Sequence, residues 1–269
     1  MGVTGPLERL RARLAEGRAA VGVAGLGYVG LPLALEFARS GYPVTGIDPD
    51  AGKVAGVVRG ESHVEDVAAA DVAAAVRAGR LRASTSWDVA DDLDAVVICV
   101  PTPFTSNREP DLSFVRAAAT ELARRARPGR LVVLESTTYP GTTDEVLAPI
   151  LEAGGLRIGR DLALAYSPER VDPGNREYHV ANTPKLVGGM TPTCTALAQT
   201  LYERVGIKVI PVSSPRVAET AKLLENIFRN VNIALVNELA MLCDRMGVDV
   251  WEVVDAAATK PFGFMSFQP

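Results

Sequence analysis

The sequence predicts an α/β protein in which a Rossmann-like, doubly wound parallel sheet is followed by a long spine helix and a partial α-helical domain. A glycine-rich motif, GLGYVG at residues 25–30, directly follows a short apolar run. Short apolar or β-branched runs then alternate with alanine-rich stretches, as in repeated βαβ units. Finally, no glycine or proline occurs between Pro215 and Gly247, so one uninterrupted helix is expected there.

Eight segments have the composition of short strands. They are residues 21–24, 44–47, 82–85, 95–100, 131–135, 162–166, 185–188 and 208–212. The run 95–100, Ala-Val-Val-Ile-Cys-Val, is apolar without alternation. Such a run is typical of a central parallel strand that is covered on both faces. Right-handed crossovers through the intervening helical stretches would then connect the strands.

The organisation changes at Ser213-Ser214-Pro215. Ser214 suits a helix N-cap, and Pro215 suits the first helical position. A helix over 215–246 would be about 48 Å long at about 1.5 Å per residue, too long for a crossover in a compact doubly wound domain. We therefore expect two domains, over 1–212 and 213–269, and interpret the helix as a spine that links domains or pairs two subunits.

The glycine motif indicates a dinucleotide site. In such a site Gly25 turns the chain sharply, Gly27 lets the backbone approach a pyrophosphate, and Gly30 allows close packing of helix and strand. The following helix would direct its free N–H groups at the phosphates. The alternative is an ordinary glycine-rich turn followed by an unrelated aspartate.

Asp48 ends the next expected strand, close to the usual offset of about twenty residues from the motif. Its carboxylate can accept hydrogen bonds from both adenosine-ribose hydroxyls. The same charge would repel the 2′-phosphate of NADP at a cost on the order of several kcal/mol. The sequence therefore favours NAD as the cofactor.

Composition excludes several classes of protein. The net charge is −4, with charges of both signs interspersed, so there is no basic field for nucleic acid. No apolar stretch is long enough to cross a bilayer and the N-terminus has no signal pattern, so a cytoplasmic protein without a membrane partner is expected. Cys99, Cys194 and Cys243 are widely separated, and His63 and His179 are the only histidines. We expect three buried thiols, no disulfide and no metal.

Two polar residues of the expected spine helix are candidates for catalysis. Lys222 and Asn226 are four residues apart and share a face with mostly apolar neighbours. An ammonium paired with a carboxamide can stabilise an oxyanion. The alternative is a solvated lysine and an asparagine at a helix interface.

Three loops follow expected strands and are rich in small polar residues: 101–103, 135–141 and 166–170. Ligands of α/β sheets bind at the carboxyl ends of the strands. Glu169, in the third loop, could be a general base acting through a water, which requires a raised pKa in a partly dry site. Taken singly, each loop is more often an ordinary turn.

Six motifs in order carry a resemblance: GLGYVGLPLA, VPTP, EST-x-x-PGTT, YSPERVDPGN, AKLLEN-x-x-R-x-VN-x-x-x-VNE and DAAATKPFGF. Together they resemble the UDP-glucose/GDP-mannose dehydrogenase family, and most of all its UDP-N-acetylglucosamine 6-dehydrogenase branch. The resemblance implies an NAD-dependent, four-electron oxidation of a sugar C6 alcohol to a uronate for surface polysaccharide precursors. The implied steps are aldehyde formation, capture by a cysteine, oxidation to a thioester and hydrolysis.

The resemblance also implies roles for individual residues. Those implied at the NAD site are Gly25, Gly27, Tyr28, Val29, Gly30, Asp48, Lys53, Thr102, Ser136 and Thr137. Those implied in catalysis are Thr137 and Glu169, which position the hydrolytic water, and Lys222 and Asn226, which stabilise oxyanions. Those implied at the UDP-sugar are Glu169, Arg170, Asn175, Arg176, Lys222 and Asn226. Pro173 replaces a second glutamate that some family members have.

The chain departs from the family where it stops. The family's nucleophilic cysteine follows the segment resembling 259–264 within a few residues, and this sequence stops at Pro269. We expect the N-terminal part of such an enzyme, without the C-terminal nucleotide-sugar domain and unable to make the uronate alone. Cys243, for example, would lie roughly 30 Å from Lys222 along the helix.

Two other functions stay open from the sequence. The Lys-x-x-x-Asn pair behind a Rossmann-like domain also resembles β-hydroxyacid dehydrogenases, which carry out a single hydride transfer. The other reading is a truncated, non-catalytic NAD-binding module. It would form a homodimer through the helix 215–246 or join a separately encoded C-terminal half.

Overall fold

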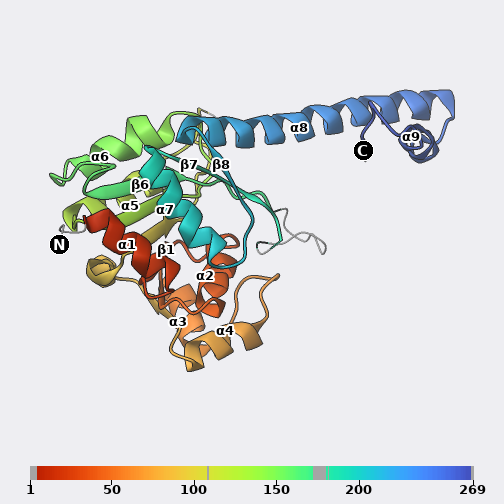
Figure 1. Ribbon diagram of the computed structural model, residues 1–269. Coiled ribbons are helices and arrows are strands. Elements are labelled where there is room, and N and C mark those ends of the chain that lie inside the picture. Colours follow the sequence, from red (N-terminus) through yellow and green to blue (C-terminus); the bar gives the residue numbers. More distant parts are fainter. Residues whose placement is uncertain (1–4, 108, 172–179, 181, 268–269) are drawn as a thin grey trace. The chain divides into compact units, whose positions relative to one another are not determined.

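The computed structural model describes residues 5–107, 109–171, 180 and 182–267 (Figure 1). The chain divides into two compact units, Met1–Thr220 and Ala221–Pro269. The boundary falls within the helix α8 (Pro215–Met246). The predicted helix over 215–246 is therefore confirmed, and the predicted domain boundary at 212/213 stays a prediction.

The first unit is built on a mostly parallel, eight-stranded sheet in the order β3-β2-β1-β4-β5-β6-β7-β8. The strands are β1 (Val21–Ala24), β2 (Val44–Ile47), β3 (Leu81–Ser84), β4 (Ala95–Ile98), β5 (Arg130–Leu134), β6 (Leu162–Tyr166), β7 (Lys185–Gly189) and β8 (Val209–Val212). The direction of strand order reverses between β1 and β4, where the two halves of a doubly wound sheet meet. The predicted Rossmann-like fold is confirmed.

One strand pair differs from the wholly parallel sheet that we expected. β7 pairs with β6 in antiparallel orientation, and β8 is parallel to β7. A parallel neighbour requires a crossover of about a dozen or more residues, usually a helix. The described residues between these strands, 167–171, 180 and 182–184, contain no helix. β7 runs back along β6 in the opposite direction.

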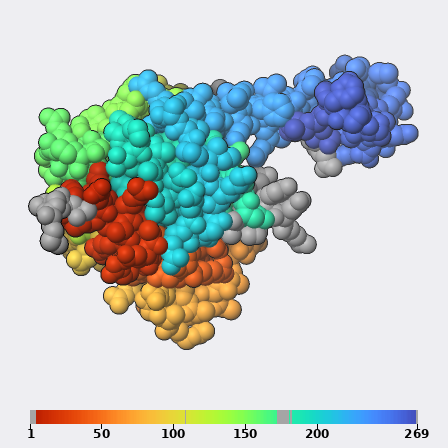
Figure 2. All heavy atoms as spheres, viewed as in Figure 1, coloured from red at the N-terminus to blue at the C-terminus, as the bar shows by residue number. Residues whose placement is uncertain are grey.

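Helices cover both faces of this sheet (Figure 1). The helical elements of the first unit are α1 (Pro6–Ala15), α2 (Gly30–Arg39), α3 (Ala51–Arg59), α4 (Ala69–Arg77), η1 (Trp87–Asp92), α5 (Ser113–Arg124), η2 (Thr142–Leu147), α6 (Ala148–Glu152) and α7 (Pro192–Glu203). Figure 2 shows α1, in red, against α7, in teal, on one face.

Two apolar clusters form the core, one on each face of the sheet. Val97 and Val133 pack with α1, α2 and α7, whereas Val96 and Val132 pack with α5 and α6. Successive residues of a strand point to opposite faces. The non-alternating run at β4 is therefore explained by burial on both sides, as the sequence indicated.

Several predicted strands are shifted by one or two residues. β4 ends at Ile98 and β5 at Leu134, so Cys99 and Glu135 lie in the loops that follow. Cys99 is accordingly only half-buried, which corrects its placement in a central strand. Cys194 is fully buried, as we expected of the thiols.

The second unit contains most of α8, then α9 (Val250–Ala258) and the segment that follows. Gly247 has φ +70° and ends α8, where the N–H of Val248 donates to the carbonyl of Cys243. The rings of Phe228 and Phe267 lie 5.7 Å apart in an edge-on arrangement. Within the described residues, no helix combines the length and the apolar character that a membrane crossing requires.

Candidate functional site

The glycine-rich loop follows β1 and has the packing that a dinucleotide site needs. Gly25 has φ +94°, and a Cβ there would lie 2.5 Å from the carbonyl oxygen of Cys99. A Cβ at Gly30 would lie 1.8 Å from the carbonyl oxygen of Gly25. At Gly27, in contrast, a Cβ would meet nothing within 4 Å. Packing therefore requires the first and third glycines, and the second borders open space that a pyrophosphate fits.

The helix after this loop presents its N-terminus to the same region. α2 begins at Gly30, and among the described residues no side chain caps it at Val29. The first turn of a helix has N–H groups without intrahelical partners, which makes it suitable for an anion. Tyr28 is 69% exposed next to these groups.

Asp48 lies at the end of β2 and is 5% exposed. Its Oδ2 accepts the N–H of Leu26 at 2.8 Å, and its Oδ1 accepts the N–H of Asp50 at 2.9 Å. Lys53 Nζ lies 3.8 Å from Oδ2. A carboxylate has about four acceptor positions, so two backbone bonds leave room for ribose hydroxyls. The bond to Leu26 also ties β2 to the glycine-rich loop, which sequence reasoning missed.

The loops after β4 and β5 are joined to each other. Thr102 Oγ1 donates to the carbonyl of Thr137 at 2.7 Å, and Ser136 Oγ donates to the carbonyl of Val100 at 2.7 Å. β4 is also the neighbour of β1 in the sheet. Thr102, Ser136 and Thr137 therefore lie together at the strand ends beside the glycine-rich loop. Their contact with a cofactor stays a prediction.

A buried cluster of charged side chains includes Glu169, from the loop 166–170 after β6. Lys185 Nζ is 2.9 Å from Glu135 Oε2 and 3.3 Å from Glu169 Oε2. The hydroxyl of Tyr202 donates a hydrogen bond to Glu135 Oε1. The ring of Tyr202 lies under the ammonium of Lys185, with 5.4 Å between Nζ and the ring centroid. The side chains of Lys185 and Glu135 are only 3% and 0% exposed. The two carboxylates therefore share one buried ammonium.

Glu169 is also held by its own backbone. Its Oε1 accepts the N–H groups of Arg170 at 2.7 Å and Val171 at 2.6 Å. Burial acts to raise the pKa of Glu169, but Lys185 and these two N–H groups together lower it below its ordinary value. The expectation of a raised pKa is therefore wrong. Sequence reasoning missed Lys185 as the partner of Glu169, because the two residues are 16 positions apart and no sequence pattern connects them.

The pKa values of the neighbouring buried groups are shifted as well. Burial acts to lower the pKa of Lys185, but Glu135 and Glu169 outweigh it and raise the pKa well above its ordinary value. Burial raises the pKa of Glu135, and Lys185 partly opposes this. Burial, reinforced by Glu135, raises the pKa of the Cys99 thiol well above its usual range. Cys99 therefore remains a thiol, not a reactive thiolate.

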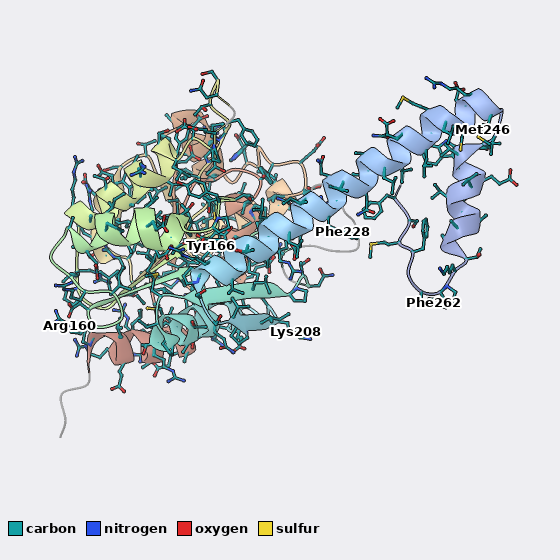
Figure 3. All side chains as sticks on the ribbon, turned by 90° about the horizontal axis from the view of Figure 1, so that it is seen from above. Arg160, Tyr166, Lys208, Phe228, Met246 and Phe262 are labelled. Atoms are coloured by element: carbon teal, nitrogen blue, oxygen red, sulfur yellow. The ribbon has the colours of Figure 1, made fainter. Side chains whose placement is uncertain are left out.

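Glu219, in the first turns of α8, is a further buried carboxylate that sequence reasoning missed. Its Oε2 accepts the N–H of Gly141 at 2.7 Å, and its Oε1 accepts the N–H and hydroxyl of Thr143 at 2.9 and 2.7 Å. Figure 3 shows Tyr166, at the end of β6, close to this turn. Glu219 thus fastens the segment after Thr137 to α8. Its only sequence signal was an acid next to Ala218 near the start of the predicted helix.

The remaining predicted site residues are placed only in part. Lys222 and Asn226 are half-buried on one face of α8, but they belong to the second unit. Their meeting with Thr137 and Glu169 stays a prediction. Arg170 Nη1 donates to the carbonyl of Pro184 at 2.9 Å. Pro173, Asn175 and Arg176 lie outside the described residues. In the part of the chain that is described, no three metal-ligating side chains are grouped.

Comparisons with known proteins give the same picture as the geometry. Residues 19–206 match the NAD-binding domain of the UDP-glucose/GDP-mannose dehydrogenase family, and residues 216–269 match its central domain. The first match contains the glycine-rich loop, Asp48, the joined loops and the buried cluster. NAD is therefore the cofactor of the domain that the sheet forms.

Individual relatives belong to the same family. The chain is 39% identical over 251 residues to a UDP-N-acetyl-D-glucosamine 6-dehydrogenase of Pseudomonas aeruginosa, covering 93% of this chain and 58% of that protein. It is 40% identical over 251 residues to the UDP-N-acetyl-D-mannosamine dehydrogenase of Escherichia coli K12, covering 90% and 59%. A solved UDP-D-ManNAc dehydrogenase of Pyrococcus horikoshii superposes with a TM-score of 0.86 at 36% identity, covering 91% and 58%.

The chain thus spans less than two thirds of the length of these relatives. The two matched domains nevertheless follow one another over most of the length of this chain, and the first of them forms the Rossmann-like sheet. The chain belongs to the UDP-glucose/GDP-mannose dehydrogenase family.

Proposed function

We propose that the chain is the N-terminal part of an NAD-dependent nucleotide-sugar 6-dehydrogenase. It would oxidise the C6 alcohol of a UDP-N-acetylhexosamine to the uronate, as a cytoplasmic step toward surface polysaccharide precursors. The observation that carries the proposal is the open space at Gly27 beside Asp48, within the family's NAD-binding domain. The names of the relatives, which act on N-acetylglucosamine and N-acetylmannosamine nucleotides, support the substrate class.

The glycine-rich loop and the start of α2 would hold the pyrophosphate of NAD, and Asp48 its adenosine ribose. When bound, NAD supplies the acceptor for a hydride from the sugar C6 carbon. Lys53 would reach the adenosine side, whereas Thr102, Ser136 and Thr137 would line the remainder of the dinucleotide. The buried carboxylate of Asp48 disfavours a 2′-phosphate, so NAD rather than NADP is expected.

Thr137 and Glu169 would position the water that releases the acid. Because Lys185 and two backbone N–H groups keep Glu169 ionised, its carboxylate can accept a hydrogen bond from that water and orient it. Its low basicity makes orientation, and not proton storage, its main contribution. Lys222 and Asn226 would stabilise the oxyanions, and Arg170 and Asn175 would contact the UDP-sugar.

The covalent steps require a thiolate at the sugar C6 carbon. Cys99 has a strongly raised pKa and Cys194 is fully buried in α7, so neither suits that role. We propose that the nucleophile comes from a part of the protein outside this sequence, in the same chain or a separate C-terminal half. A homodimer through α8 completes the proposal.

The cofactor assignment is tested by calorimetric titration of the purified chain with NAD and with NADP. NAD should bind more tightly. Asp48→Ala should weaken NAD binding by about 1.5–3 kcal/mol, the value of a hydrogen bond to a charged acceptor, and reduce the preference. Equal or tighter binding of NADP by the unmodified chain would contradict the assignment.

The reaction is tested by incubating the chain with NAD and UDP-N-acetylglucosamine, then with UDP-glucose, and measuring NADH and acid. The chain alone should release no acid at an ordinary enzymatic rate, because it lacks a suitable thiolate. The complete protein should give two NADH per acid. Two NADH per acid from this chain alone would mean that one of its own cysteines, or a route through water, suffices.

A further inference from the structure

The peptide groups on both sides of Leu26, inside the glycine-rich loop, are held by side chains from distant segments. The N–H of Leu26 donates to Asp48 Oδ2 at 2.8 Å. The carbonyl oxygen of Leu26 lies 2.6 Å from Nε2 of His63, in the connection between α3 and α4. The Leu26 side chain is fully buried, and its Cδ2 atom would lie 2.5 Å from a Cβ at Gly46. Leu26 therefore has a fixed position between Gly25 and Gly27 of the glycine-rich loop.

The bond from His63 has a consequence for the neighbouring residue. The carbonyl of Leu26 and the N–H of Gly27 belong to one planar trans peptide group and so point in opposite directions. Holding the carbonyl toward His63 therefore turns the N–H of Gly27 away from it. Gly27 is also the glycine that borders open space. His63 thus sets the direction of a backbone donor next to the expected pyrophosphate.

The connection that carries His63 is itself ordered by local bonds. Ser62 Oγ donates to the carbonyl of Val64 at 2.9 Å and accepts the N–H of Val64 at 3.2 Å. Gly60, with φ +81°, ends α3 just before this turn. The backbone on both sides of His63 is therefore constrained, which favours a defined ring position over that of a freely moving surface side chain.

We propose that His63 is a positioning residue of the dinucleotide site. It donates a hydrogen bond from Nε2 to the Leu26 carbonyl and thereby directs the N–H of Gly27 toward the pyrophosphate. A carbonyl can only accept, so Nε2 carries the hydrogen in this contact. The inference rests on the proposed NAD site but assigns a residue outside the glycine motif and outside the strand-end aspartate.

The test uses the whole 269-residue chain with three variants. His63→Ala removes the donor, and His63→Gln keeps an N–H donor at similar reach. Glu65→Ala is the control, because it shortens another exposed side chain of the same connection. Affinities for NAD, for ADP-ribose and for adenosine are measured by calorimetry, and the thermal midpoint of each variant is recorded.

His63→Ala should weaken NAD and ADP-ribose binding by about 3- to 10-fold, the effect of one net hydrogen bond. Adenosine, which lacks the pyrophosphate, should bind as to the unmodified chain. His63→Gln should restore NAD affinity to within about 2-fold, and Glu65→Ala should leave it unchanged. The amide NMR signal of Gly27 should move in His63→Ala and return in His63→Gln. A role confined to folding would instead lower the thermal midpoint and affect all three ligands alike.

Two results would overturn the inference, and they differ from failure of the proposed function. If the unmodified chain binds NAD and His63→Ala binds it equally well, His63 has no positioning role. If His63→Ala loses affinity for adenosine and for NAD to the same extent, His63 likewise has no positioning role at the pyrophosphate. If the unmodified chain does not bind NAD at all, the cofactor site itself is wrong and the inference falls with it.

Discussion

At the scale of single residues, the pairing of buried charges decides what Glu169 can do. A carboxylate in an apolar pocket favours its neutral form, whereas a nearby ammonium and two backbone N–H groups favour its charged form. Lys185, Arg170 and Val171 provide these groups, and the pKa of Glu169 is lowered despite burial. The same ammonium also serves Glu135, so removing it would leave two buried carboxylates without a cation.

The lowered pKa of Glu169 leads to a prediction about the stability of the folded chain at acidic pH. Because its folded pKa lies below the ordinary 4.5, its stabilising contribution is complete above about pH 4.5 and is lost as pH falls through the folded value. Glu169→Gln should cost about 1.5–3 kcal/mol near neutral pH. It should also lose less stability than the unmodified chain between about pH 6 and pH 3. Urea unfolding across this range measures both effects, and parallel stability curves would contradict the assignment.

The glycine-rich loop permits a matched pair of substitutions. In Gly30→Ala the new Cβ would lie 1.8 Å from a backbone oxygen, so the loop must move. We expect about 1–3 kcal/mol of destabilisation and loss of NAD binding. In Gly27→Ala the Cβ meets no protein atom, so stability should stay within about 0.5 kcal/mol while NAD binds at least about tenfold more weakly. Thermal unfolding and calorimetry test this, and normal NAD binding by Gly27→Ala would contradict the predicted pyrophosphate position.

At the scale of secondary structure, the sequence predicts elements better than their contacts. α8 was predicted with its observed bounds, because glycine and proline are absent up to Gly247 and Ser214-Pro215 begins it. For β4 the sequence predicts a strand two residues too long, because Cys99 and Val100 continue the apolar run beyond the last strand residue, Ile98. Composition indicates burial but not where the ladder of hydrogen bonds ends.

The direction of β7 and the partners of the buried acids could not be predicted in the same way. The sequence predicts another βαβ crossover before β7, whereas β7 is antiparallel to β6. The pairs Lys185–Glu135 and Glu219–Gly141 join residues 50 and 78 positions apart. No local periodicity encodes such a pair, since it arises only when β5, β7 and the start of α8 are packed together. The glycine-rich loop and Asp48 were recognised because their chemistry is local to one βαβ unit.

The attachment of the loop 141–143 to α8 gives the prediction at this scale. Glu219→Ala leaves two buried N–H groups and one hydroxyl without their charged acceptor. The chain should lose about 3 kcal/mol of stability. Arg216→Ala, one turn earlier, is the control because Arg216 pairs with Asp144 at the surface and should cost at most about 1 kcal/mol. Similar losses in the two variants would show that Glu219 does not hold this loop.

At the scale of the whole molecule, the second unit exposes an apolar stripe along α8. Leu224, Phe228, Val231, Leu235 and Leu242 are between 47% and 65% exposed. Their spacing of three, four and seven residues places them along one face of the helix. Val236 and Cys243, in contrast, are buried. Figure 3 shows Phe228 and Met246 on this helix. A stripe of this kind is typical of a surface that another chain or domain covers.

The proposed homodimer requires this stripe to be covered by a second copy. In the complete protein, Val231→Asp combined with Leu235→Asp should raise the dimer dissociation constant at least about 100-fold. Each buried aliphatic side chain contributes about 1.5–3 kcal/mol, and about 1.4 kcal/mol is tenfold. Asn230→Asp, at an exposed polar position of the same helix, is the control.

Sedimentation equilibrium measures the dissociation constant, and NAD titration checks that the first unit is unaffected. NAD affinity should not change, because the glycine-rich loop and Asp48 belong to Met1–Thr220 and both substitutions lie in Ala221–Pro269. A complete protein that sediments as a monomer would contradict the dimer and would favour coverage of the stripe by the protein's own remaining part. The isolated chain is the weaker sample for this purpose, since an uncovered apolar stripe also drives non-specific association.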